Sequence, residues 1–213
     1  MSLSLRKKYL MSLQQASAPS GRLPSGYQEV EYIETTGTQY INTGIVNKLT
    51  SKFELTIQKT ALEGDGNLQF ENGTNWWCVG YAYDGNYWFA FGKAGNGMAY
   101  EQINQTASYS KVKLWVDTKN QQYGYDSTSI NFTRYGIDDQ NAFYIGAKNN
   151  NGSPMQYCKE KIFEFKYYEN EILLNDFIPC YRTSDSEIGL YDVINNQFYT
   201  NNGSGNFTKG ADV

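Results

Sequence analysis

The sequence predicts an all-β domain, a sandwich or barrel built from about a dozen short antiparallel strands. Three observations carry this prediction. Apolar and polar residues alternate over many short runs, and that period of two is typical of strands with one buried face. Aromatic residues make up 16% of the 213 residues, which favours pleated, half-buried surfaces. The 20 glycines suit many tight turns, and no convincing helix follows Leu23.

The first strands follow a linker at residues 19–26. Residues 27–33 alternate, and we expect Val30 and Tyr32 to face inward. Residues 51–59 alternate more cleanly and place three apolar side chains on one face: Phe53, Leu55 and Ile57. Further strands are expected at 39–45, 67–70, 111–116, 121–125, 142–147, 188–193 and 197–200, with 207–208 closing the domain.

The most aromatic stretch, residues 76–91, is typical of a β-hairpin. Asp84-Gly85-Asn86 lies between two apolar runs and has the composition of a tight turn. On its first strand, four larger side chains share one face: Trp77, Val79, Tyr81 and Tyr83.

Residues 161–182 show the strand pattern most clearly. Phe163, Phe165 and Tyr167 are expected on one packed face, and the polar turn at 169–171 leads into an antiparallel partner strand. Pro179 has no N–H for a ladder, so we expect it at a strand end, a bulge or an edge.

Residues 1–24 differ in kind, and we interpret them as an N-terminal arm and linker ahead of one domain at 25–213. Three apolar side chains share one face of a short predicted helix and are candidates for binding a partner: Leu5, Tyr9 and Leu13. The alternative is a disordered tail. A secretion signal is rejected because the apolar stretch at 9–13 falls short of the 7–15 residues that such signals need.

Charge and composition exclude several classes of function. A formal net charge of −4 provides no basic footprint for nucleic acid. No apolar run approaches the roughly 20 residues of a membrane span. The chain contains no His, the commonest general base. Cys78, Cys158 and Cys180 show no zinc-ligand spacing, and we interpret them as buried, inert thiols.

Two segments together resemble a known module. Residues 23–45, LPSGYQEVEYIETTGTQYINTGI, and the closing stretch DFIPCYRTSDSEIGLYDVINNQFYTNNGSGNFTKG are similar to the two ends of a concanavalin A-like (laminin-G-like) jelly roll. That module occurs in bacteriophage structural proteins and in surface proteins of Gram-positive and gut bacteria. The resemblance implies a two-sheet antiparallel jelly-roll sandwich in which the first and last strands lie together.

The resemblance also implies a function. We expect a non-enzymatic virion structural protein that displays a lectin-like domain, for decoration of the particle or adsorption to host-surface glycans. Other virion proteins would be partners through the arm, and the protein would act in many copies. The alternative is a carbohydrate-binding adhesin of a bacterial cell surface. A glycoside hydrolase is the third interpretation, but the ExDxxE carboxylate set of such enzymes is incomplete at Glu29-Val30-Glu31 and at Glu63-Gly64-Asp65.

The aromatic hairpin is the candidate glycan site. Glycan binding needs flat aromatic faces for sugar rings beside amides or carboxylates for hydroxyls, although such aromatics also serve as core or cross-strand pairs. The candidate ligand-binding residues are Trp77, Tyr83, Asp84, Asn86, Tyr87 and Trp88.

No cofactor and no metal site is predicted. Carboxylates, amides and carbonyls are ligands of calcium, and four aspartates fall in predicted loops: Asp65, Asp84, Asp138 and Asp139. Acidic loop residues are usually only solvated, so they are not assigned to a site.

Overall fold

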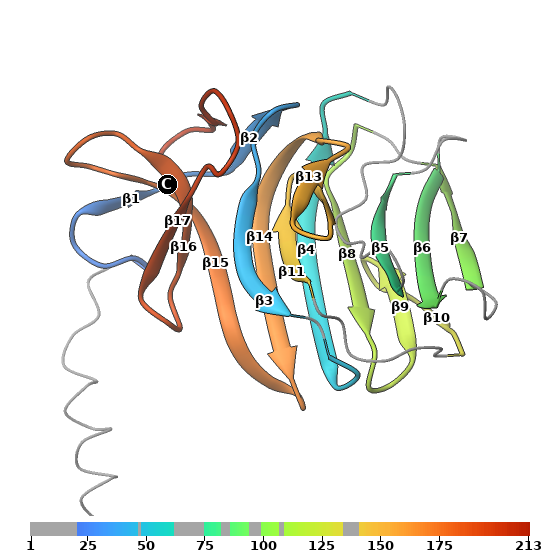
Figure 1. The fold of residues 1–213 in the computed structure, drawn as a ribbon. Helices are drawn as coiled ribbons and strands as arrows, with labels where there is room; N and C mark the ends of the chain where they lie inside the picture. Colours follow the sequence, from blue (N-terminus) through green and yellow to red (C-terminus); the bar gives the residue numbers. More distant parts are fainter. Residues whose placement is uncertain are drawn as a thin grey trace, which may run out of the picture.

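The computed structural model describes residues 21–46, 48–61, 75–81, 86–93, 99–106, 109–133 and 141–213, with the strands between 75 and 106 described by their backbone pairing. These residues form strands, turns and bends and contain no helix (Figure 1). Every pairing between the described strands is antiparallel, which confirms the all-β antiparallel prediction.

The strands in chain order are β1 (Tyr27–Glu29), β2 (Ile33–Thr36), β3 (Ile41–Val46), β4 (Ser51–Lys59), β5 (Asn75–Tyr81), β6 (Asn86–Lys93), β7 (Ala99–Thr106), β8 (Val112–Asp117), β9 (Gln122–Tyr125), β10 (Thr128–Asn131), β11 (Ala142–Ile145), β12 (Lys148–Asn150), β13 (Ser153–Met155), β14 (Lys159–Glu169), β15 (Ile172–Arg182), β16 (Ile188–Asp192), β17 (Gln197–Thr200) and β18 (Thr208–Lys209).

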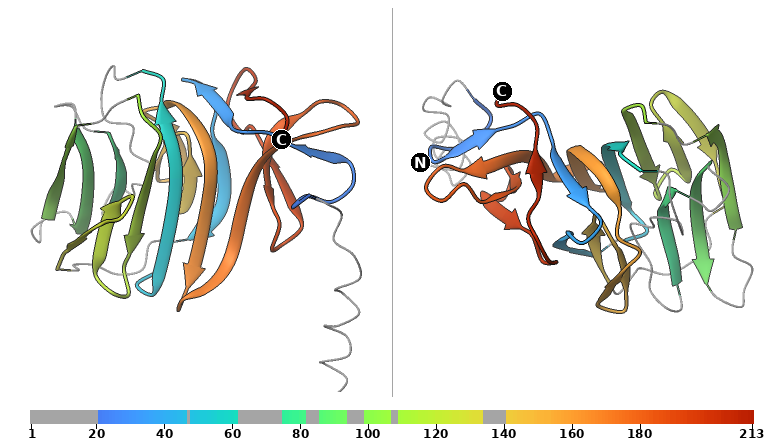
Figure 2. Two further views of the ribbon diagram at one scale, coloured as in Figure 1. Left: turned by 180° about the vertical axis from the view of Figure 1, so that it is seen from behind. Right: turned by 90° about the horizontal axis from the view of Figure 1, so that it is seen from above.

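One large sheet organises the described part of the chain. Its strands follow the order β10-β9-β8-β4-β14-β15-β16-β17, and β1, β2 and β18 join it beside β14 and β15. The sheets β3–β11 and β5–β6–β7 are smaller, and the view from above shows both on the same side of the large sheet (Figure 2). The strands β12 and β13 form a separate hairpin.

The main hydrophobic core lies between the large sheet and the sheet β3–β11. Alternation in β4 buries Phe53, Leu55 and Ile57, as predicted. Phe143 of β11 stacks on Phe165 of β14 with ring centroids 4.7 Å apart. We call the opposite side of the large sheet its outer face, which Figure 2 shows from behind. On β4, β8 and β14 it carries the half-buried residues that alternate with the core: Lys52, Glu54, Thr56, Gln58, Lys113, Trp115, Phe163, Glu164, Lys166 and Tyr168.

The prediction that Phe163 shares the packed face with Phe165 and Tyr167 is wrong. The register of β14 against β4 shifts between Ile162 and Glu164, so the strand holds one extra residue there. Ile162 and Phe165 are buried on either side of this bulge, and Phe163 turns to the outer face.

The inward assignment of Tyr32 is also wrong. Val30 is buried as expected, but Ile33 is the next residue to enter the core, and Tyr32 packs its ring against Phe163 on the outer face. The reason is that the expected strand is interrupted: β1 ends at Glu29 and β2 begins at Ile33, so the period of two does not continue across the gap.

Pro179 lies within β15, not at an end, a bulge or an edge. Leu190 of β16 is its partner on one side, and on the other side its carbonyl accepts a hydrogen bond from Val30 N. At this point the neighbour of β15 changes from β14, whose last pair is Phe165 with Phe177, to β1. The missing N–H therefore falls where one ladder ends and the next begins.

The two ends of the domain lie together, as predicted. β18 pairs with β2, and Val30 forms an isolated bridge with Asp212. β17 belongs to the same large sheet, so the first and last strands close one sheet (Figure 1).

Several predicted features fall outside the described residues, namely the arm at 1–20, the strand at 67–70 and all four loop aspartates considered for calcium. Cys158 and Cys180 are buried free thiols, which confirms their interpretation as core residues. Burial raises the pKa of the Cys180 thiol to about 12, so it stays protonated and unreactive.

Candidate functional site

The predicted aromatic hairpin exists as β5 and β6. Trp77 pairs with Phe91, Tyr87 with Tyr81, and Trp88 with Gly80. Because paired residues share a face and successive residues alternate, the positions of Trp77 and Tyr87 belong to one face and that of Trp88 to the other. Asn86 opens β6, while Tyr83 and Asp84 lie outside the described residues. In the described pairing, the position of Trp88 is therefore on the opposite face from those of Trp77 and Tyr87, and glycan binding at this hairpin stays a prediction.

A groove of about 410 Å³ lies on the outer face of the large sheet, where the sequence predicted no site. Smaller hollows of about 240 and 140 Å³ lie near the β15–β16 turn and beside Leu23. Residues from both ends of the domain and from three central segments line the groove: Arg22, Glu29, Val30, Glu31, Thr56, Lys111, Phe163, Glu164 and Val213.

Three local features build this groove. The β-bulge in β14 turns Phe163 and Glu164 outward together. Leu23 is buried against Ile178 and Cys180, which fixes the segment before β1 and carries Arg22 to the groove. The pairing of Val30 with Asp212 brings the last residues of the chain to the same place.

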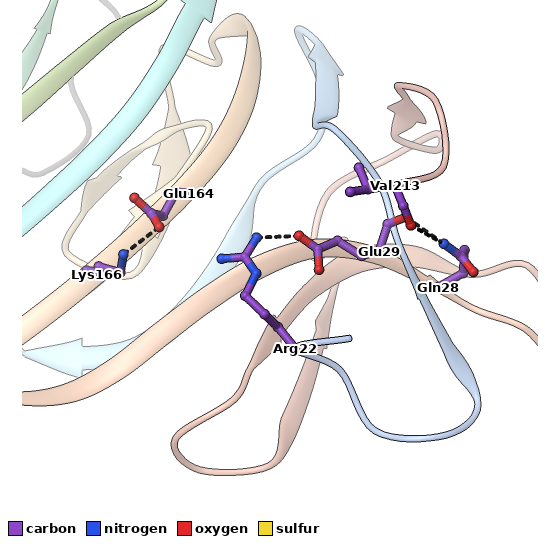
Figure 3. A network of polar contacts seen from close by, with 6 residues as sticks. All are labelled: Arg22, Gln28, Glu29, Glu164, Lys166 and Val213. Carbon is purple, nitrogen blue, oxygen red and sulfur yellow. Dashed lines mark hydrogen bonds and ion pairs between the residues drawn. The ribbon is translucent and has the colours of Figure 1, made fainter. Parts of the chain in front are cut away.

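Ion pairs hold three charged side chains of the groove in place: Arg22, Glu29 and Glu164. Figure 3 shows Arg22 directed at Glu29, with the Glu164–Lys166 pair on one side and the Gln28–Val213 contact on the other. Lys166 Nζ lies 2.5 Å from Glu164 Oε1, and Gln28 Nε2 donates to Val213 O at 3.1 Å. Both glutamates remain partly accessible to solvent, with side-chain exposures of 17% for Glu29 and 28% for Glu164.

Two lysines flank an aromatic pair at one end of the groove. The rings of Tyr32 and Phe163 meet edge to face at 5.4 Å. Lys161 Nζ lies 4.3 Å from the centre of the Tyr32 ring, and Lys111 Nζ lies 4.0 Å from that of Phe163. These cation–π contacts hold both ammonium groups over apolar surface.

Burial and neighbouring charges shift the ionisation of two residues beside the groove. Burial raises the pKa of Asp176 above its ordinary value; the Lys166 charge opposes this and that of Glu164 adds to it. Burial alone would lower the pKa of Lys166, but its hydrogen bond to Glu164 and the charges of Glu164 and Asp176 outweigh burial and raise it. Asp176 Oδ1 is buried and accepts no hydrogen bond within the described part of the chain.

One signal in the sequence pointed to part of this groove. Glu29-Val30-Glu31 has part of the carboxylate pattern of hydrolases, and both glutamates line the groove together with Glu164. Their meeting depends on the bulge in β14 and on the packing of the chain ends, which have no local sequence signature.

A second cluster of ionisable residues lies inside the core and serves the fold. Lys59 and Glu160 pair directly, with both side chains fully buried. Thr35 donates its hydroxyl hydrogen to Cys158 O at 2.7 Å. Burial raises the pKa of the Cys158 thiol, and the Glu160 charge raises it further, so the thiol is protonated. No solvent path reaches side chains with zero exposure, so this cluster is not a candidate binding site.

The described residues contain neither a group of metal ligands nor a helix that could cross a membrane. No three His, Cys, Asp or Glu side chains there are grouped so as to hold a metal ion. No helix in the same part of the chain is long and apolar enough to cross a membrane. In comparisons with known proteins, the chain matches no protein-family model and no curated protein.

The arrangement of the groove suits recognition of a hydroxyl-rich ligand. Carboxylates fixed by Arg22 and Lys166 can accept hydrogen bonds, and the ammonium groups of Lys111 and Lys166 can donate them. These groups are held in place before binding, which lowers the entropic cost of association.

Proposed function

We propose that the protein is a non-enzymatic structural component of a bacteriophage particle whose lectin-like jelly-roll domain binds host-surface glycans through the groove on its outer face. The observation that carries the glycan-binding part is the groove itself, because it brings carboxylates, the Lys111 ammonium group and the Phe163 ring to one open hollow, with Lys166 and Tyr32 in contact with its lining. The resemblance of the two chain ends to modules of phage and bacterial surface proteins supports the assignment to a phage particle.

The state of two groove carboxylates, Glu29 and Glu164, favours binding over hydrolysis. Glycoside hydrolysis needs one carboxylic acid to protonate the leaving oxygen and a second, free carboxylate on the other side of the bond. Glu29 is bound by Arg22 and Glu164 by Lys166, so both are engaged as hydrogen-bond acceptors. Such groups suit ligand hydroxyls better than proton transfer.

Attachment to the particle is assigned to the arm. Leu5, Tyr9 and Leu13 would contact another virion protein, and many copies would multiply a weak contact between each groove and the host surface. Deletion of residues 1–20, which keeps Arg22 and the buried Leu23, should then remove the protein from purified particles, as measured by mass spectrometry. Full incorporation of the shortened protein would contradict this role of the arm.

The groove is tested by binding of the full chain to isolated host cell envelopes. The double variant Arg22→Ala/Glu164→Gln removes one group from each ion pair and should weaken binding at least tenfold, because two fixed contacts with hydroxyls are lost. Lys119→Ala is the matched control, since it breaks an exposed pair with Glu171 far along the sheet. Equal binding by the wild type and the double variant would rule out the groove.

The competing assignment, a bacterial surface adhesin, makes a different prediction. The native gene product would then be secreted, with cleavage near Ala18, and would be absent from purified phage particles. Fractionation of infected and uninfected host cultures shows whether the protein is found in phage particles or on the bacterial surface.

A further inference from the structure

A half-buried tryptophan lies on the outer face of the large sheet, away from the groove lining. Trp115 is on β8, and the residue opposite it on β9 is Gly124. A Cβ added to Gly124 would lie 2.7 Å from Cζ2 of the indole, so the ring covers the glycine. The indole N–H donates to Asp126 O at 3.3 Å, which fixes the ring on the sheet.

The register connects this tryptophan to the groove. Trp115 is opposite Glu54, Glu54 is opposite Lys166, and Lys166 is opposite Asp176. Residues paired in this way share a face, so a single row crosses β9, β8, β4, β14 and β15. Four strand spacings of about 4.8 Å make the row roughly 19 Å long. Lys166 pairs with the groove residue Glu164, so the row passes beside the groove.

The charges along this row nearly balance. Three lysines and four carboxylates occupy it and the positions next to it: Lys52, Lys113, Lys166, Glu54, Asp117, Glu164 and Asp176. Lys52 Nζ lies 2.7 Å from Glu54, and Lys166 Nζ lies 2.5 Å from Glu164. Asp176 Oδ1 remains a buried acceptor without a hydrogen bond in the described residues, which is costly unless a donor arrives.

We propose that the glycan site extends along this row from the groove to Trp115, and that its ligand is a neutral oligosaccharide and not a single sugar. Trp115 stacks on the apolar face of one sugar ring, as a flat aromatic held against a glycine can do. Glu54, Lys166 and Asp176 hydrogen-bond the hydroxyls of the sugars between Trp115 and the groove. The slight excess of carboxylates gives no attraction to an anionic chain, so a neutral ligand fits best. This inference rests on the proposed glycan-binding function.

The test starts with the full chain on an array of neutral oligosaccharides, their constituent monosaccharides, and glycans containing uronic acid or phosphate. The best-bound neutral oligosaccharide is then titrated into the wild type, Trp115→Ala, Trp115→Phe and Tyr157→Ala. Tyr157 is a half-buried aromatic that packs near Tyr40, away from the outer face, and serves as the matched control. Thermal unfolding of each variant shows that the fold is retained.

We expect Trp115→Ala to bind roughly tenfold more weakly, Trp115→Phe to lose less, and Tyr157→Ala to bind like the wild type. The indole N–H resonance that disappears in Trp115→Phe should shift when the oligosaccharide is added to the wild type. Binding should change little between low and high salt, because the ligand is neutral.

The failures are distinguishable. If Trp115→Ala binds normally while Arg22→Ala/Glu164→Gln does not, the extended row is wrong and the groove stands. If monosaccharides bind as tightly as oligosaccharides, or only anionic glycans bind and salt abolishes the binding, the proposed ligand class is wrong. If the wild type binds no glycan on the array or on host envelopes, both the inference and the proposed function fail.

Discussion

Lys59 Nζ lies 2.7 Å from Glu160 Oε2, and both side chains are completely shielded from solvent. The two residues are direct partners in the pairing of β4 with β14, at the end of the ladder next to β2. The Thr35 hydroxyl oxygen accepts a hydrogen bond from Glu160 N at 3.1 Å, so three strands meet at this charge pair. Burying two charges is costly, and their close contact offsets that cost only while both are present.

Removal of either charge should therefore be severely destabilising. Lys59→Met or Glu160→Gln alone is expected to lower the free energy of unfolding by about 3–5 kcal/mol, because the remaining charge stays buried without its partner. Urea denaturation followed by tryptophan fluorescence measures the loss.

The double variant Lys59→Met/Glu160→Met provides the control. It removes both charges and fills the space with apolar groups, so it should recover most of the stability. If each single variant unfolds at the wild-type urea concentration, the pair contributes nothing and this account is wrong.

Asp192 organises the β16–β17 turn and should be the most sensitive carboxylate near that end of the sheet. It is fully buried and accepts hydrogen bonds from Asn175 Nδ2 at 2.6 Å, Asn195 Nδ2 at 2.7 Å and Ile194 N at 3.0 Å. Asp192→Ala leaves these donors without an acceptor and should cost about 3 kcal/mol of unfolding free energy. Thermal and urea unfolding of the variant and the wild type both measure this loss. Asp185→Ala, in an exposed pair with Arg182, should change little; equal effects of the two would refute the role of Asp192.

Asp176 should make stability depend on pH in an unusual direction for a carboxylate. Burial raises its folded pKa above the unfolded value, so the folded state binds the proton more tightly and stability is lost as pH rises through the folded pKa. Asp176→Asn cannot ionise and should be at least as stable as the wild type at neutral pH, with the difference vanishing near pH 3, below both pKa values. The urea midpoints of the wild type and Asp176→Asn, measured from pH 3 to pH 7, test this pH dependence. A wild type that gains stability relative to the variant as pH rises would contradict the sign.

Gly124→Ala should disturb both the sheet and Trp115. The added Cβ would lie 1.9 Å from Thr128 O, a backbone atom of the neighbouring strand, and 2.7 Å from the indole. We expect a loss of about 1–3 kcal/mol from overpacking, together with a shifted indole N–H resonance. Gly21→Ala is the control, because no atom lies within 4 Å of its added Cβ. A crystal structure of Gly124→Ala with an unmoved Trp115 would rule out the contact.

Local patterns in the sequence were sufficient to predict much of the fold. Alternation located β4 and β8 and their buried side chains, and the polar turn at 169–171 correctly joined β14 to β15. The predictions failed where the period of two is broken. A bulge turned Phe163 outward, and the gap between β1 and β2 moved Tyr32 out of the core, because one extra residue or a break in pairing puts the alternation on its two sides out of phase.

The candidate site was much harder to predict. Aromatic residues drew attention to the hairpin of β5 and β6, since composition is visible along a single stretch. The groove draws Arg22 and Glu29 from one end of the chain and Val213 from the other, with Thr56 and Glu164 between them. No window of sequence contains these residues together. Trp115 carried no special signal either, because its significance comes from Gly124 on the next strand.

The sequence by itself determined that this protein is built from antiparallel strands with one buried face, because burial of alternate side chains is a property of each strand alone. The net charge of −4 and the absence of His also argue against nucleic-acid binding and against catalysis by a His base. The tertiary structure decided which strands become neighbours, and so which charges pair, where Pro179 is tolerated and where the groove lies. Those outcomes depend on contacts between residues far apart in the chain, and a linear pattern does not encode such distances.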